Sequence, residues 1–163
     1  MNIQQFLERH RAAFEVVPHA EAFDASHIAQ ATATPGLEVA KAVLLRVNHG
    51  FRYVIAVLPS THRVDIEALS RVLGGAEVQL ATEAEVGERC PDCEFGVLSP
   101  FGSQYGAETL VDKSLTQDER IVFEGNTHHE AIRMKYADFC KLENPTVAEF
   151  AFRAPACGGS ESN

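Results

Sequence analysis

The sequence has few basic residues for its length. Its 163 residues include 14 Lys and Arg against 23 Asp and Glu, which gives a formal charge of −9. Such a balance argues against a large surface that tracks nucleic acid, because such surfaces neutralise phosphates with Lys and Arg. Apolar runs are short as well, and none approaches the length of a membrane span. We therefore expect the chain to bind neither DNA nor a membrane.

Cysteine is also scarce, and only Cys90 and Cys93 lie close together, with the CxxC spacing of a zinc knuckle or a redox motif. A structural zinc site needs two further ligands nearby, whereas Cys140 and Cys157 are scattered singly. A redox CxxC normally opens a helix directly after a strand, and this one runs into a Gly/Pro-rich segment. The alternative is a loop whose cysteines pack as small hydrophobic residues. We expect no metal and no cofactor.

The ends of the sequence bear on compartment and domain organisation. Residues 1–17 mix charge into their apolar positions, which predicts an amphipathic helix and not a signal peptide. With few cysteines, the expected compartment is the cytoplasm. Length and composition fit one domain over residues 1–153, and the small, polar residues 154–163 predict a flexible tail.

Hydrophobic patterning predicts an α+β domain around a mixed sheet. Two apolar runs, 42–47 and 51–58, are separated by His49-Gly50 and predict a hairpin buried on much of both faces. Capping residues predict helices after Asp65 and Thr82. Further expected elements are helices near the N-terminus and at 26–32 and 136–142, and strands at 77–80, 108–111, 120–123 and 131–134.

Two places in this pattern are candidates for chemistry. Lys41 stands directly before a buried strand, where a lysine is either a surface residue or an ammonium aimed into a cleft. The segment Gly96-Val-Leu-Ser-Pro100 combines a glycine that permits close backbone approach with a proline that fixes the chain. Its peptide N–H groups are then not committed to a regular ladder, and such groups can bind a carbonyl or a developing oxyanion. The other reading is a rigid apolar turn that covers a sheet edge.

Histidines are further candidates. His128 and His129 follow a predicted strand, and either is a possible proton carrier near neutral pH or a surface turn residue. His62 is a weaker candidate of the same kind. No catalytic triad, phosphate-binding loop or dinucleotide-binding motif is recognisable in the sequence.

These pieces, in their order along residues 32–142, resemble the YbaK family of aminoacyl-tRNA editing domains, which is related to the insertion domain of bacterial prolyl-tRNA synthetase. The matching stretches are Val39–Leu45, Val57–Pro59, Arg63–Asp65, Gly96–Gly102, Val111–Leu115, Thr127-His128 and Ala131–Met134. The resemblance implies a mixed, partly barrel-like sheet with flanking helices.

The resemblance also implies an activity, namely hydrolysis of a mischarged aminoacyl-tRNA that frees a small amino acid from the terminal adenosine, with tRNA-Pro as the candidate tRNA. Lys41 matches the family's functional lysine, and His128 matches a histidine of related editing domains. Residues Gly96, Val97, Leu98, Ser99 and Pro100 match the loop that lines the aminoacyl pocket. The implied partners are the acceptor end of tRNA and a synthetase that delivers it. The alternative is a non-catalytic module of the same fold that binds a ligand or a protein.

A small basic patch near the mouth of the site would help such a protein to hold tRNA. The basic residues that could form it are Lys41, Arg46, Arg52, Arg63, Arg133 and Lys135.

Overall fold

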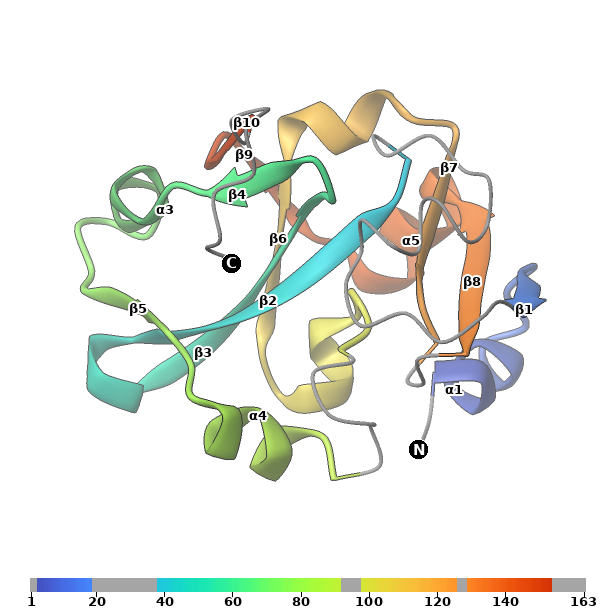
Figure 1. Cartoon of the computed structure of the whole chain (residues 1–163), viewed down its shortest axis with the longest axis horizontal. Coiled ribbons are helices and arrows are strands. Elements are labelled where there is room, and N and C mark those ends of the chain that lie inside the picture. Colours follow the sequence, from blue (N-terminus) through green and yellow to red (C-terminus); the bar gives the residue numbers. More distant parts are fainter. Residues whose placement is uncertain (1–2, 19–37, 92–97, 126–128, 154–163) are drawn as a thin grey trace.

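The fold is taken from a computed structural model that describes residues 3–18, 38–91, 98–125 and 129–153. Ten strands form three sheets in this part of the chain (Figure 1). The predicted hairpin is confirmed: β2 (Ala40–Val47) and β3 (Arg52–Pro59) pair antiparallel, and both are largely buried. They form the centre of a five-stranded sheet in the order β5-β2-β3-β6-β9.

The other strands of this sheet differ in direction. β5 (Val78–Leu80) pairs antiparallel with β2, whereas β6 (Glu108–Asp112) runs parallel to β3, and β9 (Thr146–Ala148) runs parallel to β6. The expected mixed sheet is therefore confirmed.

Two smaller sheets complete the strand arrangement. β1 (Glu15–Pro18), β8 (Glu130–Lys135) and β7 (Arg120–Glu124) form an antiparallel sheet, which joins the large sheet through a bridge between Val39 and Val122. β4 (His62–Val64) pairs antiparallel with β10 (Ala151–Arg153). Over the described residues these sheets do not close into a barrel.

The helices are short and are capped largely as the sequence predicts. α3 (Ile66–Val72) begins after Asp65, whose side chain accepts a hydrogen bond from the Ala68 amide. α4 (Glu83–Arg89) begins with a capping box formed by Thr82 and Glu85. The remaining helices are α1 (Ile3–Arg9), α5 (Tyr136–Glu143) and the 3-10 turns η1 (Asn48–Gly50), η2 (Gly102–Tyr105) and η3 (Lys113–Gln117). The helix expected at 26–32 lies outside the described residues, and none of the described helices is long and apolar enough to cross a bilayer.

Three clusters of buried side chains make up the core. The first joins α1, α5 and both larger sheets, and its aromatic centre packs Phe101 against Phe6, Phe123 and Phe139. The second covers the opposite face of β2 and β3 and includes residues of α3, β4 and Phe150. The third is small and lies around Val39 and Val122. The two faces of β2 therefore belong to different parts of the core.

Candidate active site

Lys41 lies on the face of β2 that carries the second and third clusters. Its neighbours Ala40 and Ala42 pack into the first cluster, and side chains alternate along a strand. Lys41 therefore shares its face with Val39 of the third cluster and Val43 of the second. It is half-buried, and its cross-strand partner is the fully buried Leu58. The Lys41 side chain thus leaves the sheet between two apolar clusters.

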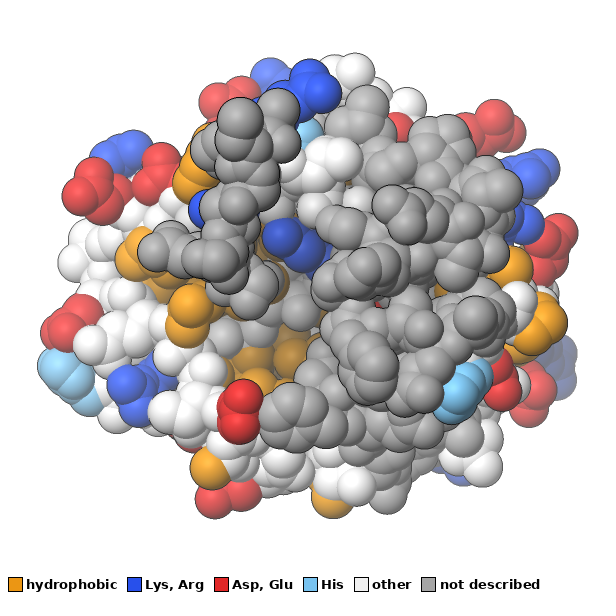
Figure 2. All heavy atoms as spheres, viewed as in Figure 1, with side chains coloured by type: hydrophobic (Ala, Val, Ile, Leu, Met, Phe, Trp, Pro, Cys, Tyr) orange, Lys and Arg blue, Asp and Glu red, His pale blue; other side chains and the backbone are white. Residues whose placement is uncertain are grey.

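A hollow is visible on the molecular surface. Figure 2 shows hydrophobic side chains exposed in the floor of this hollow and a Lys or Arg side chain beside it. An apolar floor with a cationic neighbour suits a ligand that has a small apolar group and a negative charge.

His62 and Arg153 lie directly opposite each other on the strand pair β4 and β10. Nδ1 of His62 is 2.8 Å from the Thr61 hydroxyl oxygen. The pKa of His62 is lowered, mainly because burial disfavours its charged form, and the positive charges of Arg153 and Lys41 lower the pKa further. The negative charge of Asp112 acts in the opposite direction. These interactions place His62 in the electrostatic surroundings of Lys41.

Asp112, at the end of β6, fixes the segment that leads into β10. Its side chain is buried, and Oδ1 accepts hydrogen bonds from the amides of Phe150 and Ala151, both at 2.9 Å. Oδ2 accepts from the amide and the hydroxyl of Ser114 at 3.0 and 2.5 Å. The carboxylate therefore ties two distant segments to the end of the central sheet.

The segment 96–100, named the pocket loop from here on, is described from Leu98 onwards, and Leu98 belongs to the first cluster. Leu98, Ser99 and Pro100 are all buried, and Ser99 is completely inaccessible to solvent. The Ser99 amide donates to the Tyr105 hydroxyl at 2.9 Å, and this hydroxyl donates to Ser99 Oγ at 3.0 Å. Ser99 Oγ also donates to Gln104 Oε1 at 2.7 Å.

The Ser99 amide is outside a regular ladder, as predicted, but its hydrogen bond to the Tyr105 hydroxyl leaves it closed to a carbonyl or an oxyanion. Its N–H binds a side chain that the sequence analysis had not connected with the loop. Tyr105 lies six residues further on, and the turn η2 brings it back. Ser99 is thus part of the support behind the loop.

The far end of the loop is anchored by close packing around Gly102. A Cβ at this position would lie 2.4 Å from Thr109 Oγ1 and 2.7 Å from the Ala107 carbonyl oxygen, so no larger residue fits without a shift. The Gly102 amide donates to Thr109 Oγ1, which in turn donates to Glu143 of α5 at 2.6 Å. The loop is therefore fixed to α5.

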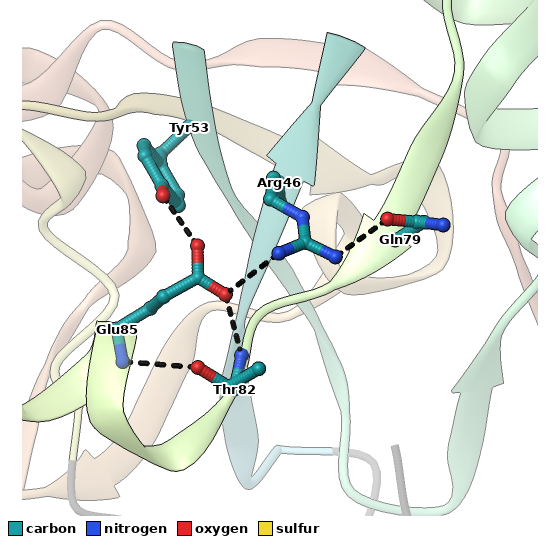
Figure 3. A network of polar contacts seen from close by, with 5 residues as sticks. All are labelled: Arg46, Tyr53, Gln79, Thr82 and Glu85. Carbon is teal, nitrogen blue, oxygen red and sulfur yellow. Dashed lines mark hydrogen bonds and ion pairs between the residues drawn. The ribbon is translucent and has the colours of Figure 1, made fainter. Parts of the chain in front are cut away.

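A polar network attaches α4 to the β2–β3 hairpin (Figure 3). Glu85 accepts hydrogen bonds from Tyr53, Arg46 and the Thr82 amide, and Arg46 also donates to Gln79 at 2.6 Å. The pKa of Glu85 is lowered, first by the Thr82 amide and then by the Tyr53 hydroxyl. Arg89 lies over the Tyr53 ring, 4.1 Å from its centroid, and donates to the Tyr105 carbonyl oxygen at 3.2 Å. This last contact connects α4 with the turn that supports Ser99.

The expected basic patch does not form from all the residues proposed for it. Arg46 pairs with Glu85, Arg52 with Glu108 and Arg133 with Glu15. The positive charge of each of these three arginines is therefore balanced by a carboxylate on a neighbouring element, at three separate places.

Three of the residues in the predicted site, Gly96, Val97 and His128, lie outside the described residues. His129 is exposed and directly precedes β8. Cys93 also lies outside the described residues, whereas Cys90 is partly buried against the first cluster and is disulfide-bonded. Among the described residues, no group of His, Cys, Asp and Glu side chains could hold a metal ion.

The fold resembles solved structures over most of its length. One is the crystal structure of a hypothetical protein, with a TM-score of 0.82 and 16% identity over 92% of this chain and 99% of the other. Another is described as a "putative trans-editing enzyme for prolyl tRNA synthetase", with a TM-score of 0.78 and 21% identity over 92% and 94% of the two chains. At these identities the likeness shows the fold alone.

Sequence comparison identifies the family. A search of curated proteins finds no match. The family model of the aminoacyl-tRNA editing domain, however, matches residues 19–142, which include Lys41, the pocket loop and His128. The chain therefore belongs to the aminoacyl-tRNA editing domain family.

Proposed function

We propose that this protein is a trans-editing aminoacyl-tRNA deacylase that removes a small amino acid from a mischarged tRNA in the cytoplasm. The observation that carries the proposal is the position of Lys41, a half-buried ammonium between two apolar clusters on one face of the central hairpin. Membership of the editing family supports it. The description of the similar solved structure makes tRNA-Pro the first tRNA to test and a synthetase the expected donor of the substrate.

The reaction needs no protein nucleophile, because an aminoacyl ester is already activated. Water attacks the ester carbonyl carbon, the bond to the ribose oxygen breaks, and that oxygen leaves as a hydroxyl after taking up a proton. The products are the free amino acid and an intact tRNA. Positioning of the water and stabilisation of the oxyanion then supply most of the rate enhancement.

Each site residue has a role in this proposal. Lys41 contacts the substrate near the terminal adenosine, and His128 orients water or carries a proton. Gly96, Val97, Leu98, Ser99 and Pro100 belong, by the family resemblance, to the loop that lines the aminoacyl pocket. Selection by pocket size is limited, because one methylene group contributes only about 1–3 kcal/mol of discrimination.

A non-catalytic binding module is the second candidate. One observation favours it: the Ser99 amide is engaged with Tyr105 and so is not available as an oxyanion donor. Such a module would bind the acceptor end of tRNA, or a protein, without hydrolysis.

Ester loss from a panel of mischarged tRNAs distinguishes these candidates. The panel contains tRNA-Pro charged with Ala, Ser, Cys or Thr, beside correctly charged Pro-tRNA. We expect selective hydrolysis of one mischarged species, and we expect its loss in a folded Lys41→Ala variant. Binding without hydrolysis of any species would support the non-catalytic module.

A further inference from the structure

We propose that Arg153 and His62 join Lys41 in an anion subsite that binds a phosphodiester of the acceptor end. This inference rests on the proposed function and adds residues to the same site. It starts from the strand register, which sets Arg153 opposite His62, and from the turn between β3 and β4, which leads from Leu58, the partner of Lys41, to His62.

The three side chains continue one face of the molecule. On β4, His62 alternates with Arg63 and shares the side of Val64, which is buried in the second cluster. On β10, Arg153 shares the side of Ala151, which packs against the same cluster. Because Arg153 lies opposite His62 and Ala151 lies opposite Val64, both strands present these side chains in the same direction.

Lys41 lies on this same face, because Val43 of the second cluster follows it at the next alternate position of β2. The Lys41 partner on β3 is Leu58, and β3 leads into β4 through Ser60 and Thr61. The Ser60 amide donates to the Val39 carbonyl oxygen at 2.7 Å, which holds this turn against the start of β2. The positive charges of Arg153 and Lys41 both lower the pKa of His62, which agrees with this placement.

The position of Arg153 is built into the fold. The amides of Phe150 and Ala151 bind Asp112, and the Asp65 amide donates to the Phe150 carbonyl oxygen at 2.6 Å. Phe150 itself is buried in the second cluster. Arg153 is therefore only two residues from a fixed anchor.

The charges around these three residues favour an anion. Within the described ranges, no carboxylate forms an ion pair with Arg153, unlike Arg46, Arg52 and Arg133. The nearby Asp112 already accepts four hydrogen bonds from its own surroundings. When the Thr61 hydroxyl donates to Nδ1 of His62, Nε2 carries the proton and can donate to a phosphate oxygen.

A phosphodiester suits this group of three donors. The guanidinium of Arg can bind both non-bridging oxygens of the phosphodiester, and the remaining lone pairs of these oxygens can accept from the ammonium and the imidazole. β10 also lies beyond residues 19–142, the part matched by the family model. The family resemblance therefore gives no indication of Arg153, whereas the strand pairing does.

The test compares Arg153→Gln with Arg71→Gln, which removes an equivalent charge from the exposed last turn of α3. In the first arm, binding of uncharged tRNA-Pro to the full chain is measured from 50 to 200 mM salt. We expect Arg153→Gln to lower the salt slope by about 0.7 to 1, as for the loss of one phosphate contact, and Arg71→Gln to leave it unchanged. His62→Gln should weaken binding in the same direction. Equal slopes for the two arginine variants would overturn the subsite.

In the second arm, hydrolysis of aminoacyl-tRNA is compared with hydrolysis of 3′-aminoacyl-adenosine, which has no phosphate. We expect Arg153→Gln to lower kcat/KM on aminoacyl-tRNA roughly tenfold, as for the loss of a charged hydrogen bond, and to leave the phosphate-free ester unaffected. An equal loss on both esters would show a structural role and would contradict the subsite.

The two arms separate this inference from the proposed function. A wild-type protein that hydrolyses neither ester, but whose tRNA salt slope depends on Arg153, would refute deacylation and retain the subsite. Active hydrolysis with no difference between the two arginine variants would support deacylation and refute the subsite. Binding of inorganic phosphate without binding of tRNA would also overturn the subsite.

Discussion

At the scale of single residues, the Tyr105 hydroxyl supports the pocket loop through hydrogen bonds to Ser99. It accepts a hydrogen bond from the buried Ser99 amide and donates one to Ser99 Oγ. Removal of a buried partner leaves polar groups unsatisfied, which costs about 1–3 kcal/mol. The shape of the pocket loop therefore depends on a side chain that lies behind it.

We expect Tyr105→Phe to lower the free energy of unfolding by about 1–3 kcal/mol, because the Ser99 amide then has no acceptor. Selectivity among amino acids should fall as well. Urea denaturation and the ratio of kcat/KM values across the mischarged tRNA panel measure the two effects. Tyr136→Phe is the control, since the buried Tyr136 hydroxyl supports no amide of the pocket loop and interacts with the Cys140 thiol, a weak hydrogen-bonding group. Equal stability losses in both variants would contradict the assignment.

Asp118 predicts a pH dependence of stability. Burial, with a contribution from the negative charge of Glu38, raises the pKa of Asp118 from 3.8 to about 6. The folded state therefore holds the proton more tightly than the unfolded chain does. The stabilising contribution of this group is complete below about pH 4 and is lost as the pH rises through about 6.

We expect Asp118→Asn to be more stable than the wild type by about 1 kcal/mol at pH 7.5, after a discount for the solvent exposure of the side chain. The difference should shrink as the pH falls to 4. Urea midpoints at both pH values measure it, with Glu38→Gln as a control that removes only the smaller, charge-dependent part. A difference that does not change with pH would contradict the raised pKa.

At the scale of elements, α4 is held to the hairpin mainly through Glu85. Its side chain is only 17% exposed and accepts hydrogen bonds from three separate partners. Because α4 also contacts the turn after the pocket loop through Arg89, loosening of this helix reaches the candidate site.

We therefore expect Glu85→Gln to lower the urea midpoint, whereas Glu83→Gln, on the exposed side of the same turn, leaves it nearly unchanged. The lowered pKa of Glu85 means that its contribution is present above about pH 4.5 and is lost at lower pH. The two variants should therefore differ most at neutral pH. Equal midpoints at neutral pH would rule out a special role for Glu85.

Elements with local signals were predictable from the sequence, and elements without them were not. The hairpin of β2 and β3 has long apolar runs and an adjacent turn, and α4 has a capping box within four residues. The strands β4, β9 and β10 are three residues long and pair with distant partners, so no local pattern identifies them.

The same reasoning explains the candidate site. Lys41 could be singled out because it stands before the apolar run 42–47; the structure places it within β2, and its role stays a prediction. Arg153 could not be singled out, because its place beside His62 depends on a pairing between distant strands. The commitment of the Ser99 amide was missed because its acceptor comes from a side chain on a following turn.

At the scale of the whole molecule, Asp112 connects the central sheet to the last described strands. Its buried carboxylate holds the segment that precedes Arg153, in addition to the pairing of β10 with β4 and the bond from the Asp65 amide.

We expect Asp112→Asn to lower the free energy of unfolding by about 2 kcal/mol, since the new amide group faces hydrogen-bond donors. Urea denaturation measures the change. Glu149→Gln is the control, because Glu149 is an exposed acid with one ion pair to Lys113 at 3.5 Å. A loss no larger than that of the control would show that Asp112 does not anchor this region.

The acidic charge of the whole molecule also sets an expectation for tRNA binding. With a net charge of −9, contact is expected to be confined to the small region around Lys41, His62 and Arg153. Recognition of the acceptor end, rather than of the whole tRNA, agrees with this distribution.

The most direct test of the account is a single-turnover measurement of ester loss from mischarged tRNA-Pro, with the protein in excess. We predict that the wild type removes one small amino acid well above the uncatalysed rate and that a folded Lys41→Ala variant does not. Rates equal to the uncatalysed reaction for every mischarged species, with tRNA shown to be bound, would contradict it.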